Sequence, residues 1–198
     1  MNDFQVVLPK RVVQQPKPQI HKGGDCAACV LAGLVGMTVE EIYTDVYEQE
    51  LDKVRAPSWI EMVRYLTKLY YDGELDRFIT DTPYWSSNDA QRTFGDTFAR
   101  QSSEWFKYVV MALDAGYYGL LNYSFDGKGP HSYPDHFVMV VGARAKSKKI
   151  RNKAGWRVEQ SLLISCSSSK TKAEFWVTLG RLARDHGGFN IMLARPKV

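Results

Sequence analysis

The stretch Gly23–Leu34, GGDCAACVLAGL, decides how the rest of the chain is interpreted. Its paired glycines permit a tight turn, and the apolar run that follows predicts a buried helix starting at or near Cys26. That run is too short to span a membrane. A thiol in the first turn of a helix lies near unpaired backbone N–H groups and the positive end of the helix dipole, which favour the nucleophilic thiolate. The stretch is therefore either the nucleophile-bearing helix of an enzyme or a buried helix carrying two small, apolar cysteines, Cys26 and Cys29.

The composition favours one soluble domain covering residues 1–198. Hydrophobic residues make up 44% of the chain, enough for a sizeable core. A net charge of +4 is too small to argue for nucleic acid by itself. The N-terminal residues lack the pattern of a secretory signal, and the three cysteines cannot all pair within the chain. We expect a reduced, cytoplasmic protein without membrane insertion, with signal-free export and the oligomeric state left open.

Helical patterns dominate the first half of the chain. Residues 1–18 are expected to form an extended arm, because prolines disfavour helix there. Capping boxes at Thr38–Glu41 and Ser58–Glu61 each predict a helix start. The first of these helices should run to about Glu50, and the second should stop at Asp72-Gly73.

Strand patterns dominate the second half. Helical spacing over 106–113 predicts one more helix, which Gly116 ends. A third capping box, Thr171–Glu174, predicts a helix that contains Phe175, Trp176, Leu179 and Leu182 and ends at Gly187-Gly188. The predicted strands are 117–123, 137–141, 157–164 and 189–194, and the second of them is apolar on both faces. Helices followed by an antiparallel sheet predict an α+β fold.

A cysteine nucleophile needs a base, and His136 is the candidate. It begins a strongly apolar strand pattern, which would hold it rigidly at a strand end that can still face a cleft. A capped structural histidine remains the alternative interpretation. The other histidines are assigned to a solvated loop, a Gly/Pro-rich loop and a helix end: His21, His131 and His186.

The Cys26-x-x-Cys29 motif leaves a redox pair as a further alternative. Such motifs usually follow a strand inside a βαβ unit, whereas a proline-rich arm precedes this one. A zinc site would need Cys166 and a histidine as further ligands, and the sequence has no second motif of that kind. We expect no metal and no cofactor, and we place Cys29 in the core.

Two other stretches have structural and functional interpretations. The run 144–157 is basic, contains no acidic residue and is expected to be a solvated hairpin tip. It could attract an acidic partner, a membrane surface or RNA, but Trp156 alone accompanies it as a stacking aromatic, so no nucleic acid is expected. The aromatic-rich stretch 84–98 either walls a substrate cleft or belongs to the core.

Together, Gln19, the sequence DCAACVLA from Asp25 and the sequence HFVMVVG from His136 resemble the papain-like cysteine peptidases. The pattern is most similar to the bacteriocin-processing, double-glycine leader group. The resemblance implies Cys26 as nucleophile, His136 as base and Gln19 as oxyanion donor. It also implies a helical half, with the nucleophile at a helix N-terminus, packed against an antiparallel sheet half.

The sequence departs from that group in three places. Gln19 stands one position further from Cys26 than expected, and Ala27 replaces a glycine. The Asp or Asn expected after the next strand is missing, so the orienting residue would be one of three neighbours: Ser165, Cys166 or Ser167. A neutral orienting residue works in Cys-His-Asn sites. Asp135 and Asn152 are weaker candidates.

The sequence therefore predicts a cysteine peptidase that hydrolyses a peptide or amide bond in a peptide or protein substrate. An acyltransferase or amidase using the same Cys–His site is one alternative. A catalytically degenerate papain-like domain that binds without cutting is the other, because the acidic or amide orienting residue is absent.

Overall fold

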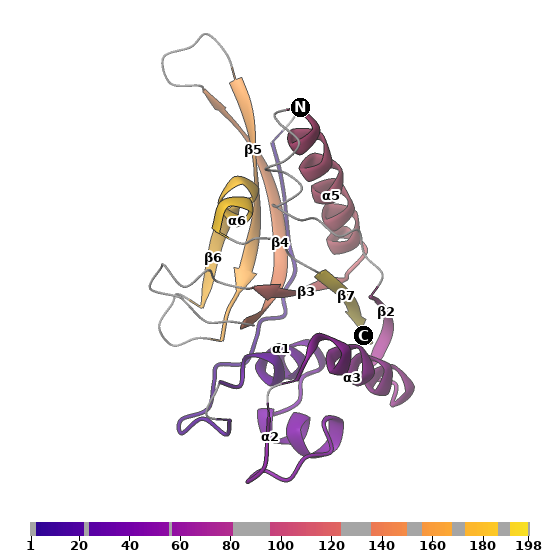
Figure 1. Ribbon diagram of the computed structural model, residues 1–198. Helices are drawn as coiled ribbons and strands as arrows, with labels where there is room; N and C mark the ends of the chain where they lie inside the picture. Colours follow the sequence, from indigo (N-terminus) through magenta and orange to yellow (C-terminus); the bar gives the residue numbers. More distant parts are fainter. Residues whose placement is uncertain are drawn as a thin grey trace.

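Helices and one antiparallel sheet form an α+β fold (Figure 1). The computed structural model describes residues 3–21, 24–55, 57–80, 96–123, 136–149, 156–167, 173–185 and 191–197. Within them the sheet has seven strands in the order β2-β7-β3-β4-β5-β6, with β1 paired to β4 off that path. The α+β expectation is confirmed at this level.

The helices are α1 (Cys26–Val35), α2 (Val39–Glu41), the π-helical turn η1 (Ile42–Val46), α3 (Trp59–Tyr71), α5 (Asp96–Asp114) and α6 (Leu179–Asp185). The strands are β1 (Phe4–Val7), β2 (Leu75–Ile79), β3 (Tyr118–Tyr123), β4 (His136–Lys149), β5 (Trp156–Ser165), β6 (Glu174–Thr178) and β7 (Ile191–Pro196).

The helix boundaries follow the predicted caps. Thr38 and Ser58 each form a complete capping box with the glutamate three residues later. Gly73 and Gly116 adopt positive φ one residue beyond the ends of α3 and α5. The helix from Thr38 is shorter than predicted, because it changes to π-helical geometry at Ile42 and ends at Val46.

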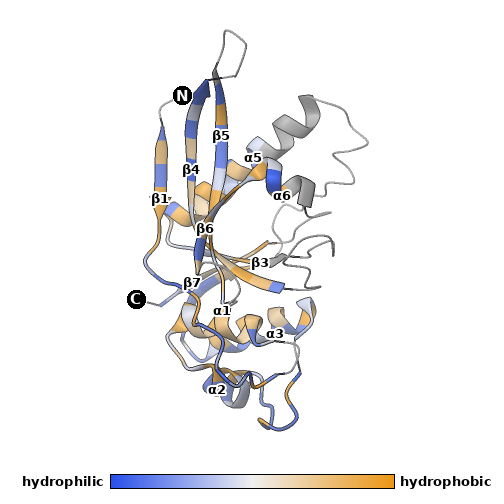
Figure 2. Cartoon of the chain, turned by 90° about the vertical axis from the view of Figure 1, so that its left-hand side faces the viewer, coloured by the Kyte–Doolittle hydropathy of each residue, from blue (hydrophilic) through white to orange (hydrophobic). Residues whose placement is uncertain are grey.

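The alternating side chains of β4 contribute to two hydrophobic cores. Phe137, Met139 and Val141 join the core built by α1, η1 and α3. Val138, Val140 and neighbouring alanines join the core that contains α5. The predicted two-faced apolar strand is therefore confirmed, and β4 lies between the helical half and α5. Its far end, 146–149, is exposed and hydrophilic (Figure 2).

The N-terminal arm is extended, as expected, and it crosses α1. After β1, the amide of Val13 donates to the Cys29 carbonyl at 3.1 Å. The crossing requires glycine at position 33, since a Cβ there would lie 2.1 Å from the Arg11 carbonyl oxygen. The arm is thus fixed against the helix that carries Cys26.

The helix predicted after Thr171–Glu174 is wrong over Phe175 and Trp176, whereas its later part, with Leu179 and Leu182, is confirmed as α6. Glu174–Thr178 forms β6, which pairs along β5, and α6 begins only at Leu179. The amide of Arg181 donates to the Thr178 hydroxyl at 3.2 Å, so Thr178 provides a cap instead. Pairing with β5, which is not a local feature of the sequence, overrides the local helix signal. Strand β2 was not predicted.

The helices give one result about membranes. Within the described parts of the chain, no single helix is long and apolar enough to cross a bilayer. The helix pair Cys26–Val35 and Val39–Val46 is together long and apolar enough, by length and composition alone, but the two helices are bent by 107° relative to each other.

Candidate functional site

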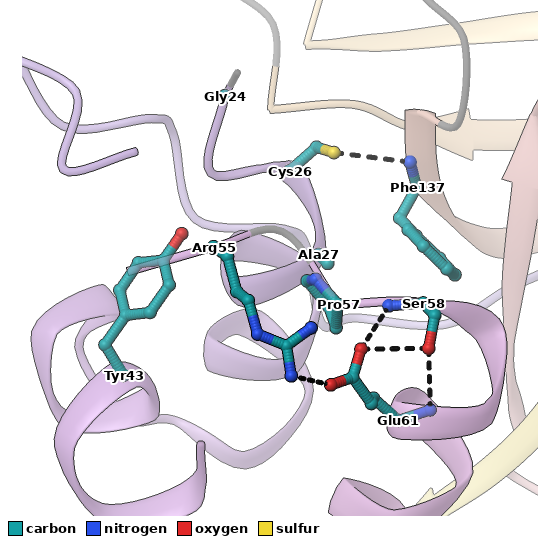
Figure 3. Close-up of a pocket in the computed structure, with 9 residues that line it drawn as sticks. All are labelled: Gly24, Cys26, Ala27, Tyr43, Arg55, Pro57, Ser58, Glu61 and Phe137. Carbon is teal, nitrogen blue, oxygen red and sulfur yellow. Dashed lines mark hydrogen bonds and ion pairs between the residues drawn. The ribbon is translucent and has the colours of Figure 1, made fainter. Parts of the chain in front are cut away.

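Cys26 is the first residue of α1, and its side chain is almost fully buried. The Gly24 backbone, with a φ of 104°, makes the turn into the helix, as the glycine pattern predicted. The amide of Phe137 donates to Cys26 Sγ at 3.4 Å (Figure 3). Burial raises the pKa of Cys26, and hydrogen bonds from the backbone amides of Phe137 and Ala27 oppose that rise. The resting site therefore favours the thiol.

His136 is the first residue of β4 and is also buried. Its ring Nε2 lies 3.1 Å from Cys166 Sγ. Because the next residue, Phe137, contacts Cys26, the start of β4 lies between the N-terminus of α1 and the end of β5. Three distant parts of the chain thus place Cys26, His136 and Cys166 around one strand end.

The structure distinguishes the three candidate orienting residues. Ser165 Oγ accepts from the Val12 amide at 3.1 Å, and Ser167 Oγ lies 3.5 Å from Gln15 Nε2. Both serines therefore face the N-terminal arm. Cys166, between them, faces the imidazole of His136, as alternation along an extended segment requires.

Gln19 lies on the exposed part of the arm, and its side-chain amide donates to Gln15 Oε1. That orientation directs the amide along the arm rather than toward a carbonyl on Cys26. The weaker candidates His131, His186, Asp135 and Asn152 lie outside the described residues, as does the aromatic stretch up to 95.

Asp25 is a buried carboxylate to which the sequence analysis assigned no role. Its Oδ1 accepts from the His21 amide and from the Tyr43 hydroxyl, both at 2.8 Å, and its Oδ2 accepts from the Ile20 amide at 3.1 Å. Burial, then the hydrogen bond to Asp25, raises the pKa of Tyr43. A charged residue directly before an apolar run was the available signal, because buried charges need partners.

Removing this carboxylate should destabilise the protein. Asp25→Ala leaves buried donors without an acceptor, so we expect the free energy of unfolding to fall by at least about 1–3 kcal/mol. Tyr43→Phe removes one donor and keeps the acceptor, so its cost should be smaller. Urea denaturation measures both variants, and an Asp25→Ala protein as stable as wild type would contradict this role.

Cys29 is a core residue. It is fully buried, and burial followed by the charge of Asp25 raises the pKa of Cys29 to about 12. None of the three cysteines forms a disulfide. Among the described residues, no group of three or more His, Cys, Asp or Glu side chains is arranged to hold a metal ion.

A pocket of about 240 Å³ opens beside Cys26 (Figure 3). Gly24 lines the pocket from the turn before α1, Ala27 lines it from α1 itself, and Phe137 lines it from β4. The polar lining residues are Tyr43, Arg55, Ser58 and Glu61, with Pro57 beside them. Cys26 therefore lies at the wall of a space that can admit a small chemical group.

Comparisons of this chain with protein-family models, with curated proteins and with solved structures find no match. The arguments for function therefore rest on the site geometry and on the sequence pattern.

Proposed function

We propose that the protein is a cysteine peptidase of papain-like architecture, in which Cys26 is the nucleophile and His136 the base. The observation that carries this proposal is that the start of β4 lies between the N-terminus of α1 and the end of β5, where Phe137 contacts Cys26 and His136 contacts Cys166. Cys26 Sγ contacts the Phe137 amide at 3.4 Å, and His136 Nε2 contacts Cys166 at 3.1 Å. A nucleophile, a base and a group that orients the base are the parts that covalent catalysis needs.

Cys166 would determine which imidazole nitrogen acts as the base. When Nε2–H donates to Cys166 Sγ, the other nitrogen, Nδ1, carries a lone pair and can accept the Cys26 proton. A thiol is a weak acceptor, so Cys166 orients the ring but adds no negative charge to stabilise imidazolium.

The chemical steps follow from this assignment. The Cys26 proton moves to His136 as Sγ attacks the substrate carbonyl. The carbon–nitrogen bond then breaks, and the amine leaves with that proton. Water hydrolyses the resulting thioester and restores the thiol. The backbone amide of Cys26 lies at the N-terminus of α1, where amides lack intrahelical acceptors, and would donate to the oxyanion. Gln19 would have to turn from Gln15 to assist.

Burial of Cys26 indicates when the proton moves. Since burial raises the pKa of Cys26, the free protein would keep a thiol, and deprotonation would accompany substrate binding. This feature is also the observation that favours the second candidate, a papain-like domain that binds peptides without cutting them.

A cysteine-directed vinyl sulfone probe tests the proposal. We expect labelling of Cys26 ahead of Cys29 and Cys166, mapped by mass spectrometry, and loss of that selectivity in His136→Ala. Slow and unselective labelling that is indifferent to His136 would support the binding protein instead. Products formed with an added amine would separate an acyltransferase from a hydrolase.

Substitutions at Cys166 test its orienting role. Cys166→Ala removes the partner of Nε2, and we expect probe labelling of Cys26 to slow by up to about 10²-fold through loss of ring alignment. Cys166→Ser supplies a hydroxyl of similar size and should preserve most of the rate. Cys29→Ala, which removes the other buried thiol, is the matched control. Equal rates for the alanine and serine variants at every pH would exclude the role.

A further inference from the structure

The pocket beside Cys26 is small, and a packed aromatic ring supports one of its walls. Its volume, about 240 Å³, lies below the ~300–1,000 Å³ of sites that enclose a whole small-molecule ligand, so it fits one side chain of a longer substrate. Its Phe137 wall is held in place because the ring stacks on Trp59 of α3, with centroids 6.2 Å apart. A residue near the reacting bond would therefore insert its side chain here.

The polar groups of the pocket differ in what they can still bind. Both carboxylate oxygens of Glu61 are occupied: Oε1 accepts from Arg55 Nη2, while Oε2 accepts from the Ser58 amide at 2.8 Å and from its hydroxyl at 2.9 Å. The Tyr43 hydroxyl donates to Asp25. Glu61 and Tyr43 therefore have little left to offer a bound substrate group.

Arg55 is different. Its guanidinium carries five N–H donors in total, and Nη2 is the atom that contacts Glu61. Its side chain is 66% exposed, whereas that of Glu61 is 21% exposed. The hydrogen bond to Glu61 raises the pKa of Arg55, so the guanidinium stays charged. The backbone of Arg55 is held by its amide, which donates to Gln49 Oε1 at 2.9 Å. A chemical group that enters the pocket thus meets the exposed, positively charged guanidinium of Arg55 before it meets Glu61.

We propose that this pocket selects a substrate with a glutamate or aspartate side chain near the scissile bond, and that Arg55 determines this specificity. The carboxylate would bind the remaining Arg55 donors, while Ala27, Pro57 and Phe137 would contact the aliphatic part of the side chain. The N-terminus of α3, capped by Ser58, adds to the positive potential at this wall. This inference rests on the proposed function, because it names the substrate class of that site.

Tripeptide vinyl sulfones test the inference. Each probe carries Glu, Gln, Leu or Lys at one of the three positions before the reactive group, and the rate of Cys26 modification is measured. At one of these positions, we expect the Glu probe to modify Cys26 roughly ten- to hundredfold faster than the Lys probe. That ratio corresponds to the free energy of one hydrogen bond to a charged group. Because the Glu-to-Lys ratio is taken within one protein, changes in thiol reactivity cancel.

Variants assign the preference to Arg55. Arg55→Gln should abolish the preference for Glu, and Arg55→Glu should reverse it toward Lys. Glu61→Gln retains a capping-box side chain and removes the charge that pairs with Arg55. The preference of this variant for the Glu probe should therefore rise. Arg64→Gln is the matched control, because Arg64 lies on α3 away from the pocket lining and its guanidinium approaches Glu48 at 3.9 Å.

The outcomes separate this inference from the proposed function. Selective, His136-dependent labelling of Cys26 without any preference for Glu would overturn the inference alone. If no probe labels Cys26 selectively, the enzyme proposal fails. In that case, the pocket is tested by the binding of fluorescein-labelled Glu and Lys tripeptides to Cys26→Ala, measured by anisotropy. Stronger binding of the Glu peptide supports the assignment of the pocket, and equal binding overturns it.

Discussion

Replacing His136 with alanine is expected to slow modification of Cys26 by a vinyl sulfone by roughly 10²–10⁴-fold, the usual contribution of general acid–base catalysis. The imidazole is the group that can accept the thiol proton in the proposed site. Cys26 Sγ lies 3.4 Å from the amide of the very next residue, Phe137. The rate should be measured under pseudo-first-order conditions, with the modified residue identified by mass spectrometry.

The pH dependence of the remaining reaction gives an independent check. Without His136, the reactive thiolate must form by simple ionisation of a buried thiol, whose pKa burial raises above the ordinary value of 9.0. The alkylation rate of His136→Ala should therefore keep rising with pH beyond that value, while wild type should reach its plateau at lower pH. His21→Ala is the matched control, because the backbone amide that His21 donates to Asp25 is retained. Superimposable profiles for wild type and His136→Ala would refute the assignment of the base.

Gly33→Ala is expected to destabilise the protein and to disturb the site from a distance. The new Cβ would lie 2.1 Å from the Arg11 carbonyl oxygen and 2.7 Å from Val12 Cα, so the arm must move. Overpacking of this kind costs about 1–3 kcal/mol. The arm also donates from Val12 to Ser165 Oγ at 3.1 Å, directly before Cys166. Displacement of the arm should therefore slow labelling of Cys26 as well.

Gly180→Ala provides the control for this effect. Gly180 lies in α6, where an added Cβ would meet no atom within 4 Å, and alanine has the higher helix propensity. We expect its free energy of unfolding in urea to be unchanged or slightly higher, with unchanged Cys26 labelling. If Gly33→Ala behaves like Gly180→Ala in both measurements, the arm does not support the site.

Local patterns in the sequence were sufficient for several features. The glycine turn and apolar run placed the start of α1 at Cys26, and the capping boxes placed the starts of α2 and α3. The apolar run after His136 predicted a strand that is apolar on both faces. These features depend on hydrogen bonds and side-chain periods within a few residues, which is why the sequence alone determined them.

Other features depend on contacts between segments far apart in the chain, and only the tertiary structure decided them. Residues Glu174–Thr178 became β6 because β5 supplied a partner strand, although a helix signal preceded them. Alternation along the strand implied that Ser165 and Ser167 share one face. Only the position of the arm showed that this face is toward the arm, so that Cys166 contacts His136 on the other face. The bonds of Asp25 and the pocket beside Arg55 likewise join segments far apart in the chain. Their geometry depends on how helices and sheet pack together, which no local period or cap encodes.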